Sequence, residues 1–230
     1  MARPNRFRRL DYNVKEMKNV NYKAIAVLAA QVKGFLAEDE GKALFELALE
    51  AASHGPCLEI GSFCGKSAVY LGTACKLKGV TLFTIDYHTG SEEQQPGELY
   101  FDPEIYDARK GEIDSFPLLR ATLRKAELEN TVVPMVTWSK VAARNWTTPL
   151  DLVFIDGGHS YEAAYTDYQC WHKHLVPGGY LIFHDIIPDP AKGGQAPYEV
   201  YKKAVASSQF DELPMVNTLG ILKKRHAVML

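Results

Sequence analysis

The residues with the clearest capacity for chemistry lie in the segment Cys57–Ser67, where a short apolar run leads into a glycine-rich turn. The run contains a carboxylate, Glu59, and is followed by Gly61 and Gly65 before an apolar stretch that begins at Ser67. This order predicts a strand, a tight turn and a helix, and such a turn presents backbone N–H groups to a ligand. Because Glu59 would repel a phosphate, the pattern favours a nucleoside with a positively charged tail.

The same turn is similar to the phosphate-binding P-loop, in which four residues separate the first glycine from a Gly-Lys-Ser triplet. Here Gly61 and Gly65 enclose only three residues, so the loop is too short to wrap a phosphate with successive amides. The apolar run 152–156, which ends in Asp156, matches the strand and aspartate that accompany a P-loop. A nucleoside triphosphatase is therefore one alternative, and a turn that binds no ligand is another.

Four acidic residues lie at the ends of predicted buried strands, namely Glu59, Asp86, Asp156 and Asp185. Strands that alternate with helices form a parallel, doubly wound sheet, and ligands collect at the carboxyl edge of such a sheet. Carboxylates grouped at one edge repel one another unless they bind something. The four acids therefore predict a ligand site at this edge.

Hydrophobic periodicity predicts the elements that must position these acids. The predicted helices cover residues 22–32, 36–53, 67–77, 114–128 and 161–171, with a short one from Ser139. The predicted strands begin at Cys57 and cover residues 80–86, 131–136, 151–156 and 180–185, with two more between 210 and 223. The alternation stops at residues 87–111, where interleaved acidic and aromatic residues predict an ordered binding loop or lid.

Length and composition describe one ordinary globular domain. The 230 residues carry a formal net charge of -2 and are 47% hydrophobic, and no apolar run reaches the ~20 residues of a membrane span. We therefore expect a cytoplasmic protein that binds neither nucleic acid nor membranes. We divide the chain into a basic N-terminal arm with a short helix at residues 1–35 and a single domain at 36–230, with a lid-like insertion at about 87–111. The sequence leaves the oligomeric state open, including a homo-oligomer.

Taken together, the motifs resemble those of class I S-adenosylmethionine-dependent methyltransferases, and in particular the branch that includes O-methyltransferases of sugars and other small molecules. The motifs are Leu58–Ser67, Phe154–Tyr161 with its Asp-Gly-Gly-His, and Pro177–Asp185 with its final His-Asp. The resemblance covers roughly residues 36–223. It implies a Rossmann-like, doubly wound α/β fold with a mostly parallel seven-stranded sheet and an antiparallel last strand.

The resemblance also implies a set of cofactor contacts. Asp86 would accept hydrogen bonds from the ribose hydroxyls. Trp138 and Ser139 match the segment that usually brackets the adenine in this fold. The methionine end would be lined by Glu59, Gly61 and Gly65. The other expected contacts with the cofactor are Ser62, Ser67, Tyr87 and Asp156.

Methyl transfer to oxygen requires an acceptor hydroxyl about 3 Å from the methyl group and a group that removes its proton. His159 is the predicted base, since it follows Asp156 by three residues and histidine titrates near neutrality. These two residues form the predicted catalytic pair. A histidine that only caps a helix or packs in the core is the alternative.

Asp156, His184 and Asp185 are candidate ligands for Mg²⁺ or another divalent cation. His184 stands where metal-dependent relatives of this fold usually offer an acidic or amide group, which leaves the metal open. Two histidines and a carboxylate also hold iron in non-haem oxygenases, so a hydroxylase is a further alternative. That alternative gives Glu59 and Asp86 no role.

The methyl acceptor is the least determined part of the prediction. The insertion and the segment 193–198 are expected to close over the substrate, with candidate contacts from His88, Glu92, Glu93, Gln195 and Tyr198. Polar loops of this kind suit a sugar or another hydroxylated small molecule, and the acids would equally suit a cationic one. We predict methyl transfer from S-adenosylmethionine to a small-molecule hydroxyl, with a nucleoside triphosphatase or a non-catalytic protein of the same fold as alternatives.

Overall fold

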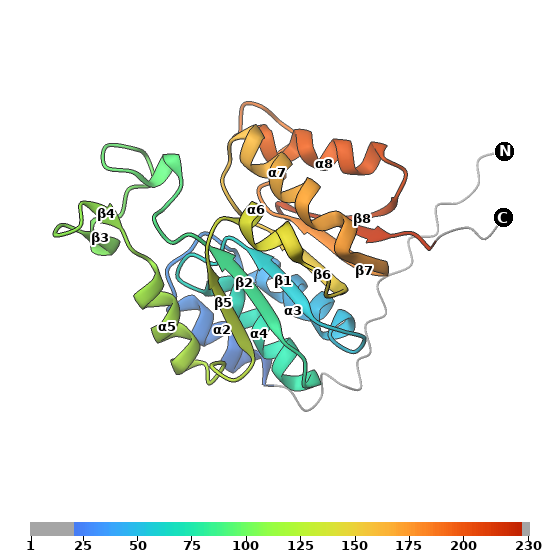
Figure 1. Cartoon of the computed structure of the whole chain (residues 1–230), viewed down its shortest axis with the longest axis horizontal. Coiled ribbons are helices and arrows are strands. Elements are labelled where there is room, and N and C mark those ends of the chain that lie inside the picture. Colours follow the sequence, from blue (N-terminus) through green and yellow to red (C-terminus); the bar gives the residue numbers. More distant parts are fainter. Residues whose placement is uncertain (1–20, 227–230) are drawn as a thin grey trace.

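The computed structural model describes residues 21–226, whose strands form one central sheet with helices on both faces (Figure 1). Seven strands lie in the order β5-β2-β1-β6-β7-β9-β8. They are β1 Cys57–Ile60, β2 Leu82–Asp86, β5 Val132–Val136, β6 Leu150–Ile155, β7 Leu175–Phe183, β8 Phe210–Val216 and β9 Leu219–Lys224. β9 runs antiparallel to both neighbours, and the remaining pairs are parallel. The predicted doubly wound, seven-stranded sheet with an antiparallel last strand is confirmed.

The helices cover the sheet in two groups. On one face lie α2 Tyr22–Ala30, α3 Glu38–Ala51, α4 Lys66–Lys78 and α5 Phe116–Lys125. On the other lie α6 Ser139–Ala142, α7 Tyr161–Trp171 and α8 Ala196–Ala206. Because side chains alternate along a strand, β1 contributes to both cores: Cys57 packs with the first group and Leu58 with the second.

The turn from β1 into α4 contains three residues with positive φ. Gly61 and Gly65 have φ values of +90° and +92°, and Phe63 between them has a φ of +44°. Gly65 is the N-cap residue of α4, and Gly79, also left-handed, ends the helix. The predicted order of strand, tight turn and helix is confirmed.

The insertion 87–111 contains short regular elements. They are the 3-10 helices η1 Glu92–Gln94 and η2 Pro103–Ile105, and the strand β3 Tyr106–Asp107, which pairs with β4 Glu112–Ile113. Ile105 and Ile113 are buried with Cys64 in a small core of their own. Figure 1 shows the hairpin projecting from the edge of the molecule near α5. The role of the insertion as a lid stays a prediction.

The strand β7 is longer than predicted. It begins at Leu175, so the Pro177–Gly179 segment, which suggests a turn in the sequence, lies inside the strand. Gly178 has a φ of +85°, and the pairing of β6 with β7 shifts register between Leu150 and Leu152. A bulge of this kind accommodates a proline and glycines without ending the strand.

The helix α8 is absent from the sequence prediction. The segment 193–198, expected as a loop over the substrate, leads into this helix, and Pro197 occupies its first turn. The buried positions Val200, Tyr201 and Ala204 have helical spacing. This pattern is short and follows Gly193, Gly194 and Pro197, which suggest a loop. Hydrophobic periodicity alone therefore did not predict the helix.

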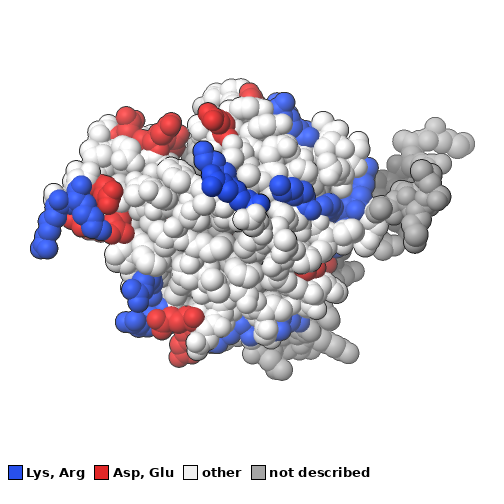
Figure 2. Space-filling view, in the orientation of Figure 1, with Lys and Arg blue, Asp and Glu red and all other residues white. Residues whose placement is uncertain are grey.

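The predicted N-terminal arm falls mainly on residues 1–20, which lie outside the described residues. α2, which we grouped with the arm, packs on the domain, since Ile25 and Ala29 are buried in the same core as α3 and α4. Within residues 21–226 no helix is long and apolar enough to cross a membrane. On the face shown in Figure 2, positive and negative side chains are interspersed and neither sign dominates.

Candidate functional site

The register of the parallel strands brings the carboxyl ends of β1, β2, β6 and β7 to one edge of the sheet. Ile60 pairs with both Ile85 and Ile155, and Ile155 in turn pairs with Phe183. Each strand therefore ends at nearly the same level. The residues that follow or close these ends are Asp86, Asp156, His184 and Asp185.

Glu59 lies beneath the turn rather than at an open strand tip. Its side chain is fully buried, and Oε2 accepts a hydrogen bond from Thr84 Oγ1 at 2.5 Å. Burial raises the pKa of Glu59 to about 7, although hydrogen bonds from Ser67 and Thr84 oppose the shift. Oε1 has no hydrogen-bond partner among the described residues. A ligand that reaches this oxygen could therefore donate a hydrogen bond to it.

The glycines of the turn allow close packing between loops. A Cβ atom on Gly61 would lie 1.8 Å from the carbonyl oxygen of Asp156, and one on Gly65 would lie 2.8 Å from a methyl group of Leu119. Both glycines are therefore required by the protein itself. Between them, Ser62 is buried and its Oγ has no partner within the described part of the chain.

Asp86 is already engaged by backbone amides. Its Oδ2 accepts a hydrogen bond from Phe63 N at 2.8 Å, and its Oδ1 accepts one from His88 N at 2.7 Å. Each carboxylate oxygen keeps a second lone pair for another donor. The next residue, Tyr87, stacks on Trp138 with ring centroids 4.5 Å apart, and both rings are exposed. Two predicted cofactor contacts thus form an aromatic surface beside Asp86.

Ser139 is held by two partners on α7. Its Oγ accepts a hydrogen bond from Trp171 Nε1 at 2.8 Å and also bonds with the carboxylate of Asp167. Asp167 is buried, which raises its pKa to about 6, and a Cβ atom on Gly157 would lie 2.7 Å from its Oδ2. Sequence reasoning missed Asp167. The available signal was an acid four residues before Trp171 on the buried aromatic face of the helix.

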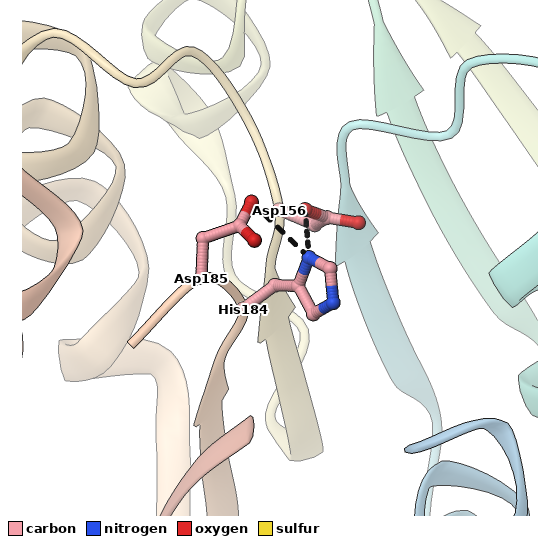
Figure 3. A group of neighbouring side chains, drawn as sticks. All are labelled: Asp156, His184 and Asp185. Atoms are coloured by element: carbon pink, nitrogen blue, oxygen red, sulfur yellow. Dashed lines mark hydrogen bonds and ion pairs between the residues drawn. The ribbon is translucent and has the colours of Figure 1, made fainter. Parts of the chain in front are cut away.

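The second cluster joins the ends of β6 and β7, as Figure 3 shows. His184 Nδ1 lies 3.0 Å from Asp156 Oδ1 and 3.3 Å from Asp185 Oδ2. One ligand atom from each of the three residues lies within 4.8 Å of the others. Asp185 has a φ of +56°, a strained conformation for a residue with a side chain. The structure therefore brings the three predicted metal ligands together.

The charges in this cluster are strongly coupled. Burial disfavours a charged ring, yet the negative charge and hydrogen bond of Asp156 raise the pKa of His184 well above its usual range. Burial alone would raise the pKa of Asp185, but hydrogen bonds from His159 and His184 hold it well below normal. The two histidines thus neutralise the acids when no cation lies between them.

His159 bridges two acids from separate segments. Its Nε2 lies 3.0 Å from Asp185 Oδ2, and its Nδ1 lies 3.0 Å from Glu93 Oε2 in the insertion. The hydrogen bond with Asp185 raises the pKa of His159 to about 9; burial opposes this shift and Glu93 adds to it. Ser160, not His159, provides the side-chain cap of α7. The helix-capping alternative for His159 is therefore wrong.

Glu40 is a second residue that sequence reasoning missed. It lies in the first turn of α3, is only 2% exposed, and contacts His184 Nε2 through Oε2 at 3.1 Å. The signal was present, because Glu40 continues the apolar stripe of α3 formed by Leu44, Leu47 and Ala51. An acid on a buried stripe requires a partner, but the sequence does not show which one.

Comparison with known families decides the class of protein. A family model described as a methyltransferase domain matches residues 58–186. This range includes the glycine turn and the cluster of Asp156, His184 and Asp185. The chain belongs to this methyltransferase family. The prediction of a class I S-adenosylmethionine-dependent methyltransferase is confirmed at this level, and the nucleoside triphosphatase alternative is set aside.

Several solved structures share the fold. The O-methyltransferase NovP superposes with a TM-score of 0.64 at 14% identity, covering 83% of this chain and 81% of that one. Cofactor-bound Rv0187 from MTB gives 0.62 at 17% identity, covering 98% and 100%. The O-methyltransferase TomG from Streptomyces achromogenes, in complex with S-adenosylmethionine, gives 0.61 at 18% identity, covering 93% and 95%. At these identities the similarity shows the fold.

A curated relative matches a short segment only. The uncharacterized protein R132 of Acanthamoeba polyphaga mimivirus is 39% identical over 36 residues, which is 16% of this chain and 16% of that protein.

The predicted acceptor contacts of this methyltransferase are not all gathered at the cluster. Glu93 reaches His159, whereas the neighbouring Glu92 is exposed. His88 is buried and its Nδ1 lies 2.8 Å from Ser115 Oγ. Gln195 donates to the carbonyl oxygens of Ile187 and Gly193, and the ring of Tyr198 lies under Lys202 Nζ. Of the five residues, Glu93 contacts the predicted base, His159.

Proposed function

We propose that this methyltransferase transfers the methyl group of S-adenosylmethionine to a hydroxyl group of a small molecule, such as a sugar or another hydroxylated metabolite. The observation that carries the proposal is that two buried atoms in β1 and the turn after it, Glu59 Oε1 and Ser62 Oγ, have no hydrogen-bond partner among residues 21–226. Buried polar atoms without partners are rare in folded proteins. The ammonium group of the cofactor would supply hydrogen-bond donors at the end of the site that the family resemblance assigns to methionine.

The ribose and adenine would lie beyond this turn. The free lone pairs of Asp86 would accept hydrogen bonds from the ribose hydroxyls, while the amides of Phe63 and His88 keep the carboxylate in place. The stacked rings of Tyr87 and Trp138 offer an exposed aromatic face to the adenine. Ser139 would contact the adenine through its backbone, because its hydroxyl is already bonded to Trp171 and Asp167 of α7.

Two features support an oxygen acceptor. NovP and TomG, which share the fold, are O-methyltransferases. In addition, the site contains a base of the required strength, since Asp185 and Glu93 stabilise the protonated form of His159. Neutral His159 would accept the hydroxyl proton during transfer, and the two carboxylates would stabilise the imidazolium that results.

Asp156, Asp185 and Nδ1 of His184 would hold a divalent cation. Two carboxylates and one imidazole, with ligand atoms within 4.8 Å of one another, form a donor set that suits Mg²⁺ or Mn²⁺. When bound, the cation would supply Lewis-acid activation of the acceptor hydroxyl. Asp156 and Asp185 would then orient the acceptor, and His159 would remain available to remove its proton.

Calorimetric titration with S-adenosylhomocysteine tests this function, first with Mg²⁺ and then with EDTA. We expect micromolar binding and a loss of at least ~10-fold in affinity for Asp86→Ala, because a charge-assisted contact is worth about 1.5–3 kcal/mol. Asp211→Ala, which removes an exposed carboxylate paired with Arg225, is the matched control. Folded wild-type protein that binds no S-adenosylhomocysteine contradicts the proposal. If binding is present, turnover with labelled S-adenosylmethionine over a panel of sugars and phenols identifies the acceptor class.

A further inference from the structure

Glu40 is a buried carboxylate that the methyl-transfer chemistry leaves without a role. Its Oε1 accepts hydrogen bonds from Thr218 N at 2.9 Å and from Thr218 Oγ1 at 2.6 Å. Its Oε2 accepts one from Ala37 N at 2.9 Å and lies 3.1 Å from His184 Nε2. The residue lies outside the segment matched by the family model. Four donors from three parts of the chain therefore fix one side chain.

This arrangement determines where the proton of His184 lies. Both oxygens of Glu40 accept hydrogen bonds from backbone N–H groups, Oε1 from Thr218 and Oε2 from Ala37, so the side chain acts as an acceptor toward His184. His184 must then carry a hydrogen on Nε2. The other ring nitrogen, Nδ1, is directed at Asp156 and Asp185, as Figure 3 shows.

Glu40 also cannot adjust its position easily. The bond from Ala37 N ties it to the start of α3, and the two bonds from Thr218 tie it to the turn between β8 and β9. His184 itself is 5% exposed, so neither partner is free to rotate into solvent. A rigid acceptor behind a buried ring is an arrangement that selects one tautomer.

We propose that Glu40 is a positioning residue that keeps a hydrogen on Nε2 of His184, so that Nδ1, once it gives up its own hydrogen, serves with Asp156 and Asp185 as a ligand for a divalent cation. The inference rests on the cation assistance proposed above. Histidines that bind metals typically donate the other ring N–H to a carboxylate, which orients the ring and strengthens the metal-binding nitrogen. Glu40 supplies this carboxylate from α3, far from the methyltransferase motifs in sequence.

The test compares Mn²⁺ binding by full-length wild type, Glu40→Gln and Glu46→Gln. The glutamine at position 40 can present an N–H group to Nε2, which favours the opposite tautomer with hydrogen on Nδ1. We expect Mn²⁺ affinity to fall ~10–100-fold in this variant, as for loss of other outer partners of metal-binding histidines. Glu46→Gln, on the same helix and in an ion pair with Lys42 instead of a contact with His184, should bind Mn²⁺ like wild type. Mn²⁺ affinity of Glu40→Gln equal to wild type overturns the inference.

A second measurement needs no variant. Nitrogen-15 spectra of histidine-labelled wild type with Mg²⁺ should show His184 with hydrogen on Nε2 and a shifted Nδ1; hydrogen on Nδ1 overturns the inference. S-adenosylhomocysteine binding in EDTA is measured on the same samples and should be equal in wild type and Glu40→Gln. Wild type that binds S-adenosylhomocysteine but no Mn²⁺ overturns the role of Glu40 and leaves methyl transfer standing. Wild type that binds Mn²⁺ but no S-adenosylhomocysteine overturns methyl transfer. In that case the Mn²⁺ affinities of wild type and Glu40→Gln still decide the role of Glu40.

Discussion

At the scale of single residues, the site contains two acid–base groups whose pKa values are both raised by their environments, that of Glu59 to neutrality and that of His159 above it. Glu59 is a carboxylate that burial holds partly protonated near pH 7, and His159 is an imidazole that two carboxylates hold protonated. Ordinary side chains of these types have pKa values of about 4.3 and 6.5. Both groups therefore titrate where activity and stability can be measured.

Glu59 should make stability depend on pH in a defined direction. Its folded pKa, about 7, is above its unfolded value, so the folded state binds more protons between these values and loses stability as pH rises through them. Glu59→Gln has no carboxyl group to titrate, so we expect it to keep its stability over this pH range. The unfolding free energy of the variant minus that of wild type should therefore increase by roughly 2–3 kcal/mol from pH ~4.5 to ~7. Urea denaturation at several pH values measures it. A difference that stays constant with pH contradicts the assigned pKa.

His159 should control the pH dependence of turnover. With a pKa of about 9, only its neutral form can accept a proton, so turnover should rise with pH up to that value. We expect His159→Ala to lower turnover ~10²–10⁴-fold while sparing binding of S-adenosylhomocysteine.

Glu93→Gln provides a finer test of the same group. Because Glu93 raises the pKa of His159, its removal should move the rise in turnover to lower pH. Glu92→Gln, at the exposed neighbouring position, is the control and should leave the profile of wild type unchanged. If the two variants give the same profile, the contact between Glu93 and His159 does not form during turnover.

At the scale of elements, the insertion 87–111 contacts the rest of the domain through several side chains. One contact is the bond between Glu93 and His159. Another is Lys33, between α2 and α3, whose Nζ pairs with Asp102 and Glu104 at 2.5 Å each. Nearby, the ring of Phe35 contacts those of Phe63 and Tyr100. These contacts connect the insertion to the segment before α3 and to the glycine turn.

Lys33→Ala should loosen the insertion without unfolding the domain. Because both ion pairs are partly exposed, we expect a loss of about 1 kcal/mol or less in overall stability. Hydrogen exchange in residues 98–107 should become faster, while affinity for S-adenosylhomocysteine stays near that of wild type. Lys76→Ala, which removes an ion pair with Glu127 elsewhere, should not change exchange in that segment. Unchanged exchange in Lys33→Ala would show that the other contacts of the insertion hold this segment without the two ion pairs.

The elements with strong local signals could be predicted from the sequence. β1, the turn and α4 combine a short apolar run, two glycines with positive φ and a helical repeat, and each of these signals is contained in about twenty residues. α8 and the start of β7 could not, because the proline and glycines inside β7, and the glycines before α8 with the proline in its first turn, suggest loops. In α8, Val200 and Tyr201 are buried in the core on the face of the sheet that carries α6 and α7, and this burial outweighs the local preference for a loop.

At the scale of the whole molecule, the site depends on residues far apart in the chain. The strand-end acids could be predicted because a parallel sheet brings its carboxyl ends together. Glu40 and Asp167 could not, since their partners Thr218 and Ser139 become neighbours only when α3 and α7 pack on the sheet. Sequence periodicity shows that these acids face the core but does not show what they meet there.

Binding of the cofactor should stabilise the molecule as a unit. A ligand that binds only the folded state adds about 2.7 kcal/mol at 100 times its dissociation constant. We expect S-adenosylhomocysteine to raise the melting temperature and to protect residues 59–67 and 86–88 from hydrogen exchange most strongly. Protection confined to other segments would show that the ligand binds elsewhere in the protein.

The contact of Gly61 with the backbone of Asp156 has a consequence for how new specificities could arise. The segment proposed to hold the cofactor and the segment that carries the acceptor chemistry touch without any side chain between them. A change in the length or direction of either segment would displace the other. The contact between Gly61 and Asp156 therefore restricts which sequence changes the protein tolerates. Variation in acceptor choice would instead be introduced through the insertion 87–111, where positions other than Ile105, which packs with Cys64 of the glycine turn, can change while the contact between Gly61 and Asp156 is preserved.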